Sequence, residues 1–205
     1  MKISKTVKYL LFVLTMSIFS NCNKDEVSLN NKQIPINNTF DIDVDKDSIN
    51  DIEFYAYYHT GMSHDNNELM ITPLNGYEIL KDSSKISYTG RGVGVSASIP
   101  NIRNFDSTLN VSIPKIYLRG DYINKTDSVI NQSIFICYAW SANYDGHMEW
   151  KNREWIKDEE RYIGFRKKTE NGYKIGWIKL KVLDYSKAYL LGYKIPVETE
   201  NLLIQ

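Results

Sequence analysis

Short runs of alternating apolar and polar residues dominate the chain from about residue 40 onward. Tyr, Ile and Val are frequent within these runs, and Gly, Asn, Asp and Ser separate them, a composition typical of strands and turns. The pattern predicts strands at Phe40–Asp45, Ile52–Tyr58, Glu68–Leu74, Gly76–Leu80, Lys85–Thr89, Val93–Ile99, Lys115–Arg119, Ser133–Trp140, Arg161–Arg166, Tyr173–Leu183 and Lys187–Ile195.

These runs favour an all-β fold. Helical periodicity is confined to one or two turns within Glu149–Glu160, so no helix of ordinary length separates the strands. Many short strands without helical crossovers are typical of antiparallel sheets packed face to face. Asn171–Gly172 is the strongest turn signal, because this dipeptide suits a two-residue hairpin. We therefore expect a single jelly-roll-like antiparallel β-sandwich over residues 40–205.

The segment before this domain divides into two parts. Residues 1–21 combine lysines at positions 2, 5 and 8 with an apolar run of 11 residues, Tyr9–Phe19. Spanning a bilayer takes about 20 apolar residues, so this shorter run predicts a secretion signal that is removed. Residues 22–39 are rich in Asn and lack periodicity, which predicts a flexible tether.

Cys22 stands directly after the signal-like segment and is followed by Asn23-Lys24-Asp25-Glu26. This arrangement resembles bacterial lipoprotein signals, in which such a cysteine receives palmitate-type acyl chains, although Asn21 replaces the usual small residue before it. The lysine-plus-acidic sequence resembles the export tag of surface lipoproteins in the Bacteroidetes. The resemblance implies a membrane anchor at Cys22, an outer-membrane location and exposure at the cell surface. An ordinary secretory signal with an incidental cysteine is the alternative.

Removal of the signal leaves a weakly acidic chain. Of the 25 Lys and Arg residues three lie in the signal, so 22 remain against 25 Asp and Glu residues. A nucleic-acid binder shows a basic face, so this balance argues against a nucleic-acid partner. Cys137 is the only other cysteine and lies in an apolar run. That position predicts a small buried hydrophobic residue rather than a catalytic thiol.

Four aspartates cluster between the first two predicted strands. Asp43, Asp45, Asp47 and Asp51 occupy positions 1, 3, 5 and 9 of a loop. Ca²⁺ takes six to eight oxygen ligands, and alternate residues of a tight turn can direct carboxylates at one centre. At position 7, Ile49 would offer its backbone carbonyl and pack its side chain inward. The pattern predicts a structural Ca²⁺ site that fixes the first hairpin; a solvated acidic turn is the alternative.

This loop resembles the calcium loops of integrin-type propeller repeats and thrombospondin type 3 repeats. It departs from an EF-hand loop at two positions. Ser48 stands at position 6, where glycine permits a left-handed backbone. Phe54 stands at position 12 in place of the bidentate glutamate. We therefore expect weak affinity, in the range of about 0.1–1 mM that extracellular modules show.

A second pattern lies near the C-terminus, where Tyr162–Arg166 reads YIGFR and Gly176–Ile178 reads GWI. It resembles the C-terminal hairpin of uncharacterised secreted and surface proteins from Bacteroidetes and other bacteria. The resemblance implies a β-sandwich and brings no established activity. On the residues alone, glycines at matching places in paired strands leave room for a ring such as that of Trp177. The hairpin therefore predicts core packing.

The stretch Ser141–Glu160 is the longest polar segment that contains large aromatic residues. Tyr144, Trp150 and Trp155 could stack on a sugar ring, while polar neighbours supply hydrogen bonds; a tryptophan that plugs the edge of the core is the alternative. The sequence shows no nucleophile elbow. We therefore expect a non-enzymatic binding or accessory protein with a glycan or surface-protein partner, and a glycan-binding or glycan-hydrolysing protein is the second hypothesis.

Overall fold

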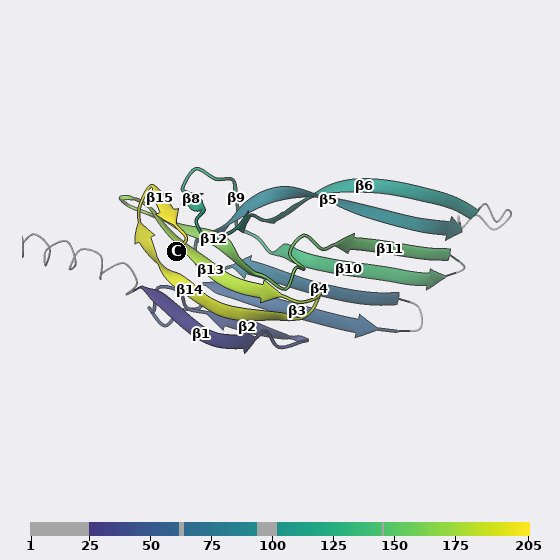
Figure 1. The fold of residues 1–205 in the computed structure, drawn as a ribbon, viewed down its shortest axis with the longest axis horizontal. Helices are drawn as coiled ribbons and strands as arrows, with labels where there is room; N and C mark the ends of the chain where they lie inside the picture. The colour runs from purple at the N-terminus through teal and green to yellow at the C-terminus, as the bar shows by residue number, and fades with distance from the viewer. Residues whose placement is uncertain (1–24, 62–63, 94–101, 145) are drawn as a thin grey trace, which may run out of the picture.

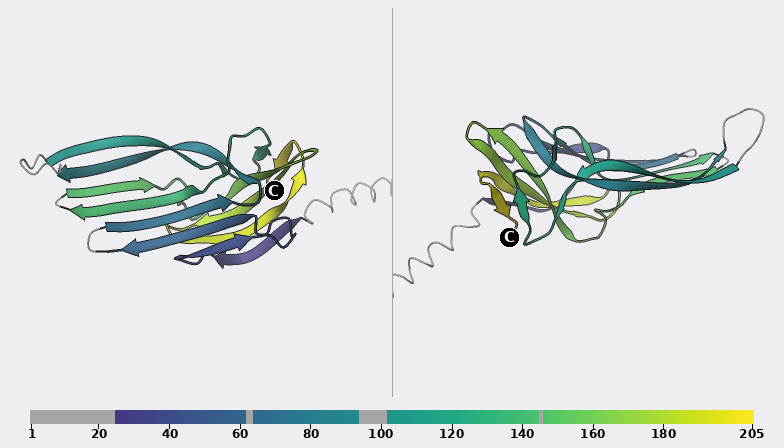
Figure 2. Two further views of the ribbon diagram at one scale, coloured as in Figure 1. Left: turned by 180° about the vertical axis from the view of Figure 1, so that it is seen from behind. Right: turned by 90° about the horizontal axis from the view of Figure 1, so that it is seen from above.

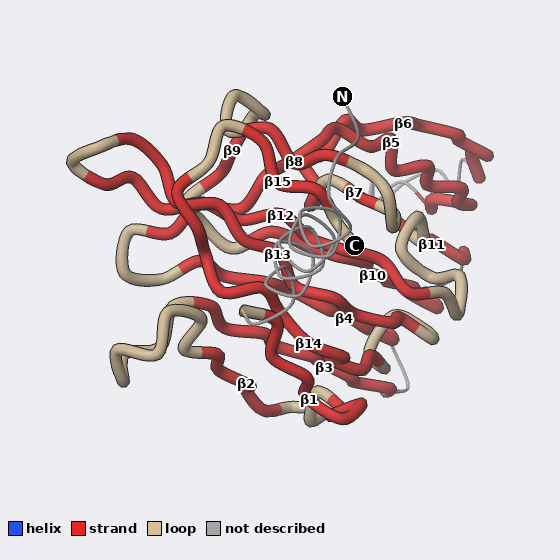
Figure 3. The backbone as a smooth tube through the Cα atoms, turned by 60° about the vertical axis from the view of Figure 1, so that its left-hand side comes forward, coloured by secondary structure: helices blue, strands red, loops and turns tan. Residues whose placement is uncertain are grey.

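The computed structural model describes residues 25–61, 64–93, 102–144 and 146–205, and these contain strands and loops but no helix (Figure 3). The all-β prediction is confirmed. The strands are β1 (Glu26–Gln33), β2 (Asn38–Ile42), β3 (Ile52–Thr60), β4 (His64–Pro73), β5 (Tyr77–Val93), β6 (Ile102–Pro114), β7 (Ile116–Tyr117), β8 (Tyr122–Asn124), β9 (Val129–Ile130), β10 (Ile134–Tyr144), β11 (Gly146–Asn152), β12 (Glu160–Thr169), β13 (Gly172–Val182), β14 (Ala188–Glu198) and β15 (Asn201–Leu203).

Two large antiparallel sheets form the sandwich, and one long strand belongs to both (Figure 1). Sheet A has the order β1-β14-β13-β12-β5, with β7 beside β12 and β9 beside β5. Sheet B has the order β2-β3-β4-β10-β11-β5-β6. β5 pairs with β12 over Tyr77–Ile79 and with β6 over Lys81–Val93. The strand therefore carries the chain from one sheet into the other.

The core lies between the inner faces of the two sheets. Along β3, Ile52, Phe54 and Ala56 are fully buried, whereas the residues between them are not, as expected for a strand with one covered face. Leu180 of β13 and Leu190 of β14 belong to the same buried cluster. Removing these apolar side chains from water stabilises the sandwich. The predicted antiparallel β-sandwich is confirmed.

A third layer covers part of the outer face of sheet A. β8 and β15 form a two-stranded sheet, and Ile123 of β8 packs in a second buried cluster with Tyr162 and Trp177 of sheet A. We call this two-stranded sheet, together with the turn Leu118–Asp121, the C-terminal lobe. Trp177, whose outer side the lobe covers, meets the Tyr162 ring at 5.1 Å and nearly at a right angle. Such an edge-to-face pair adds to the energy of burial.

The β12–β13 hairpin has the predicted core-packing role. Thr169 pairs with Gly172, so the turn residues are Glu170 and Asn171, one position earlier than the predicted Asn171–Gly172. Gly164 faces Trp177 across the two strands, and a Cβ atom at Gly164 would lie 3.0 Å from the Leu80 side chain. Both hairpin glycines therefore leave room for neighbouring side chains, although the ring that lies against Gly176 belongs to Phe165.

Several predicted boundaries were wrong. The segment expected to be a flexible tether instead contains β1, which pairs with β14 and contributes Val27 and Leu29 to the core. Two predicted strands, Gly76–Leu80 and Lys85–Thr89, are parts of the single strand β5. The predicted strand Val93–Ile99 lies outside the described residues beyond its first position, and β6 was missed. The helical turns expected within Glu149–Glu160 are strand and turn.

Candidate metal centre

The acidic loop connects β2 to β3 and is held at both ends by buried residues. The Asp51 amide donates to the Ile42 carbonyl at 2.9 Å, which closes the loop. Val44 inside the loop is fully buried in the core, so the chain between them is drawn against the end of the sandwich. This packing brings carboxylate oxygens of Asp43, Asp45 and Asp51 within 4.8 Å of one another.

Asp51 is the deepest of the three carboxylates. Its side chain is fully buried, and Oδ2 accepts a hydrogen bond from the Val44 amide at 2.9 Å. Its other oxygen, Oδ1, is buried without a hydrogen-bond partner among the described residues, and so is Oδ1 of Asp45. A buried carboxylate oxygen that meets no donor costs free energy. Two such oxygens beside a third carboxylate form an arrangement that a cation stabilises.

Asp45 connects the loop to sheet A. Its Oδ2 accepts a hydrogen bond from the Tyr77 hydroxyl of β5 at 2.9 Å and lies 3.4 Å from the Lys167 ammonium of β12. Burial raises the pKa of the Asp45 carboxyl, but the Tyr77 hydroxyl and the Lys167 charge outweigh that effect and hold its pKa below the ordinary value. Asp45 is therefore ionised at neutral pH.

Burial has the opposite outcome at Asp51. Loss of water raises the pKa of the Asp51 carboxyl above its ordinary value, and the nearby negative charge of Asp45 raises it further. The Val44 amide opposes this rise without cancelling it. In the absence of a cation, the ionised form of Asp51 is therefore the destabilised one. A divalent ion at the centre would remove this penalty by pairing with both carboxylates.

Asp43 organises the loop backbone. Its two carboxylate oxygens accept hydrogen bonds from the Asp47 amide at 3.2 Å and the Ser48 amide at 2.7 Å. The turn requires left-handed backbone at Lys46, with φ 63°, and at Ser48, with φ 74°. The departure noted at position 6 therefore stands: a serine occupies a conformation that glycine adopts without strain.

The Asp47 carboxylate and the Ile49 side chain are not placed as expected. The Asp47 carboxylate accepts a hydrogen bond from the Ile49 amide at 2.9 Å and does not belong to the group of three. The Ile49 side chain is 53% exposed, so the expectation that it packs inward was wrong. Val44, rather than Ile49, is the apolar residue of the loop that packs into the core.

Comparison of the chain with protein-family models, with curated proteins and with solved structures finds no match. The functional argument therefore depends on this chain's own residues. Within the described part of the chain, no helix is both long and apolar enough to cross a bilayer. Cys22, the predicted lipidation site, lies outside the described residues.

Of the three aromatic residues predicted to bind a sugar, Trp155 is buried and does not support this prediction. Trp155 is 1% exposed, and its indole nitrogen donates to the Pro114 carbonyl at 3.3 Å. It fills the core as a plug and offers no face to a sugar. Tyr144 lies at the end of β10 and Trp150 lies on β11, where the backbone of Trp150 pairs with Trp140; the placement of their side chains is outside the described part of the structure.

Cys137 has the predicted structural role. The thiol is fully buried and lies 3.5 Å from the Tyr185 carbonyl. Burial raises the pKa of this thiol far above its ordinary value. Because the thiolate is the nucleophilic form, the raised pKa leaves Cys137 unsuited to covalent catalysis.

Sequence reasoning missed an aromatic surface on the outer face of sheet B. Tyr55, Tyr57 and His59 alternate along β3, with ring centroids 6.2 and 6.4 Å apart and nearly parallel planes. Across β4, cross-strand register continues from Tyr57 through Glu68 to Tyr138 of β10. Partial burial raises the pKa of Tyr138 to about 12. The sequence pattern that could have revealed this surface is a ring at every second position of β3, on the face where a solvent-exposed strand normally carries polar residues.

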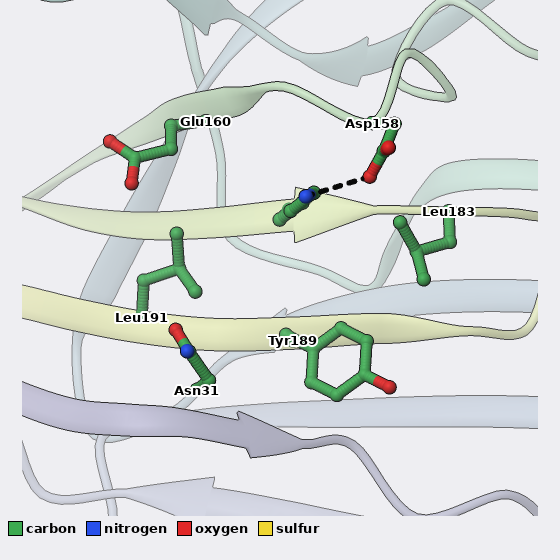
Figure 4. A pocket seen from close by; sticks show the side chains of 7 residues that line it. Asn31, Asp158, Glu160, Leu183, Tyr189 and Leu191 are labelled. Atoms are coloured by element: carbon green, nitrogen blue, oxygen red, sulfur yellow. Dashed lines mark ion pairs between the residues drawn. The ribbon is translucent and has the colours of Figure 1, made fainter.

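A shallow pocket of about 400 Å³ lies on the outer face of sheet A (Figure 4). It is lined by Asn31, Asp158, Glu160, Lys181, Leu183, Tyr189 and Leu191. The Lys181 ammonium lies 2.8 Å from the Asp158 carboxylate, and Lys179 lies 3.4 Å from Glu160. Because each carboxylate has a lysine partner, the pocket presents no unbalanced charge to a ligand.

Proposed function

We propose that this chain is a lipid-anchored protein of a Bacteroidetes-like outer membrane, exposed at the cell surface, with a non-enzymatic binding or accessory role. The observation that carries the proposal is Cys22, which follows an 11-residue apolar run and a lysine-containing start. Folded structure begins close behind it, because β1 starts at Glu26. Two or three acyl chains hold a protein on a membrane, since each buried methylene contributes roughly 0.8 kcal/mol.

The anchor is tested by replacing the lipidated residue. Wild-type protein expressed in a Bacteroidetes host is expected to incorporate labelled palmitate and to sediment with the outer-membrane fraction. The Cys22→Ser variant should incorporate none and should leave that fraction. Cys137→Ser is the matched control, because the Cys137 thiol is buried in the core and should not affect labelling. Equal labelling of wild type and Cys22→Ser would contradict the anchor.

We further propose that Asp43, Asp45 and Asp51 hold a structural Ca²⁺. Three carboxylates supply hard oxygen ligands, and backbone carbonyls with water can complete the six to eight that Ca²⁺ takes. The unpartnered oxygens of Asp45 and Asp51 support a cation rather than a solvated turn. The centre also contacts sheet A, through Tyr77 and Lys167. A bound ion would therefore stabilise the junction between the β2–β3 hairpin and sheet A.

Chelation provides the calcium test. At about 5 mM Ca²⁺ and a dissociation constant of about 0.1–1 mM, binding should stabilise the domain by about 1–2 kcal/mol. A chelator should therefore lower the melting temperature of wild type by roughly 3–8 °C. The double variant Asp43→Asn, Asp45→Asn should show no chelator response. Asp47→Asn is the matched control, because Asp47 lies outside the group of three, and its response should equal that of wild type.

The aromatic surface of sheet B favours one candidate partner, a glycan chain. Partly exposed rings of Tyr57, Tyr138 and Trp140 share this face with the carboxylate of Glu68. Aromatic area combined with a few polar groups is the chemistry of small-ligand and sugar sites. On a glycan array, Trp140→Ala or Tyr57→Ala should abolish any wild-type signal, while Tyr122→Ala on the C-terminal lobe should preserve it. Glycan binding that survives in both Trp140→Ala and Tyr57→Ala would exclude this surface as the glycan-binding site.

A further inference from the structure

The C-terminal lobe lies at the end of the molecule where the described chain begins (Figures 1 and 2). Asp25 is fixed to β14, because its carbonyl accepts a hydrogen bond from the Ile195 amide at 2.8 Å. β14 continues to Glu198, and β15 begins at Asn201. The lobe therefore follows directly from the strand that holds the start of the domain.

The lobe has one buried and one exposed face. Ile123 and its cross-strand partner Leu202 face the core side, whereas Tyr122 and its partner Leu203 are 64% and 37% exposed. Leu118, 48% exposed, stands in the turn that precedes β8. Of the seven large apolar side chains that are exposed among the described residues, these three belong to this lobe. Tyr122 and Leu203 are cross-strand neighbours, and adjacent exposed apolar residues mark an interaction surface.

The distance from Cys22 to the folded domain limits how far the lobe can move from the anchor. Glu26 is the fourth residue after Cys22, and four residues span at most about 14 Å when fully extended. β1 is paired to β14 from Glu26 onward, so no longer tether is available. An acylated Cys22 therefore keeps this end of the sandwich next to the lipid at a high effective concentration.

We propose that the exposed face of the C-terminal lobe rests on the bilayer to which Cys22 is anchored. This inference depends on the proposed lipid anchor. The Tyr122 side chain suits the membrane–water interface, because its ring is apolar and its hydroxyl remains hydrated. Leu118 and Leu203 supply apolar area that gains free energy in the acyl boundary.

The contact fixes which part of the molecule faces outward. The three hairpins formed by β3 and β4, β5 and β6, and β10 and β11 extend toward the opposite end of the long axis (Figure 1). With the lobe on the lipid, these hairpins extend away from the bilayer. The aromatic residues His59 and Trp140 lie on these hairpins, so the candidate glycan surface points into the medium.

The orientation is tested with the mature lipidated protein in phosphatidylcholine vesicles that contain nitroxide-labelled lipid. An environment-sensitive fluorophore is attached through Leu203→Cys or, as the distal control, through Tyr58→Cys, a position that is 47% exposed on β3. The buried Cys137 does not compete for the label. Lipid quenching is expected to be several-fold greater at position 203 than at position 58. Adding Leu118→Asn and Tyr122→Asn should reduce quenching at position 203 toward the distal level, although the anchor still holds this end of the domain near the lipid.

The outcomes separate the two proposals. Equal quenching at positions 203 and 58 in protein that still floats with the vesicles overturns the lobe contact and leaves the anchor intact. Unchanged quenching after Leu118→Asn and Tyr122→Asn also overturns it, because the apolar residues would then not hold the lobe. Failure of the parent protein to carry acyl chains or to float overturns the anchor, and the lobe contact with it.

Discussion

Replacing Trp155 with alanine is expected to lower the free energy of unfolding by about 3–5 kcal/mol, the range for removal of a large buried aromatic side chain. Trp155 is 1% exposed and stands in the connection between β11 and β12. It belongs to the same buried cluster as Cys137 and Leu180, which lie on opposite sheets. Its removal would therefore open a cavity between the two sheets.

The Trp155 side chain contributes a hydrogen bond from its indole nitrogen in addition to its apolar volume. It donates to the carbonyl of Pro114 at 3.3 Å, at the end of β6. Trp155→Phe keeps most of the apolar volume but leaves that carbonyl without its donor, which costs about 1–3 kcal/mol. In urea denaturation we therefore expect wild type to be the most stable, Trp155→Phe to be less stable and Trp155→Ala to be the least stable.

The exposed-aromatic variant Tyr122→Ala is the control for this series. Tyr122 is 64% exposed, so its replacement in the unlipidated domain should change stability by no more than about 0.5 kcal/mol. If Trp155→Ala matched Tyr122→Ala in stability, the role of Trp155 as a core plug would be wrong. The series also helps to interpret the glycan test. If Trp155→Ala loses glycan binding, its low stability shows that the loss reflects unfolding rather than a lost sugar contact.

Residue alternation predicted most of the fold, because the inner face of each sheet is buried and much of the outer face is not. β3 follows its predicted range closely, since apolar side chains on every second residue pack into one core. The β12–β13 hairpin also lies close to its predicted range, although consecutive residues are buried there because the C-terminal lobe covers part of its outer face. β1 was missed for a specific reason. Its alternation of Val27 and Leu29 is cut short by Asn30 and Asn31, which adopt positive φ and shift the pairing with β14. Such a bulge interrupts the pattern on which the prediction depends.

In the acidic loop, residue spacing predicted part of the arrangement of the carboxylates but not all of it. Spacing alone predicted that Asp43, Asp45 and Asp51 converge, and they do. It could not predict that the Asp47 carboxylate folds back onto the Ile49 amide, because this local hydrogen bond competes with any shared centre. Spacing also could not predict the contacts that residues distant in sequence make with Asp45. Tyr77 and Lys167 reach Asp45 only because β5 and β12 are neighbours in sheet A.

Replacing Gly176 with alanine is expected to destabilise the domain by about 1–3 kcal/mol, because the added methyl group has no room. A Cβ atom at this position would lie 2.7 Å from the Lys194 carbonyl oxygen of β14 and would overlap the Phe165 ring of β12. The carbonyl belongs to a paired strand, so it cannot move without disturbing the sheet. Gly61→Ala is the matched control, since its Cβ would meet only the end of the His59 side chain at 3.2 Å and a carbonyl at 3.5 Å.

The effect of Gly176→Ala should extend to the metal centre. The Phe165 ring meets the Tyr77 ring edge to face at 5.7 Å, and the Tyr77 hydroxyl donates to the Asp45 carboxylate. A ring displaced by the new methyl group would press on Tyr77 and disturb that hydrogen bond. We therefore expect Gly176→Ala to weaken Ca²⁺ binding measured by titration calorimetry, while Gly61→Ala leaves it unchanged. Unaltered calcium affinity in a destabilised Gly176→Ala protein would show that core and loop are not coupled through Tyr77.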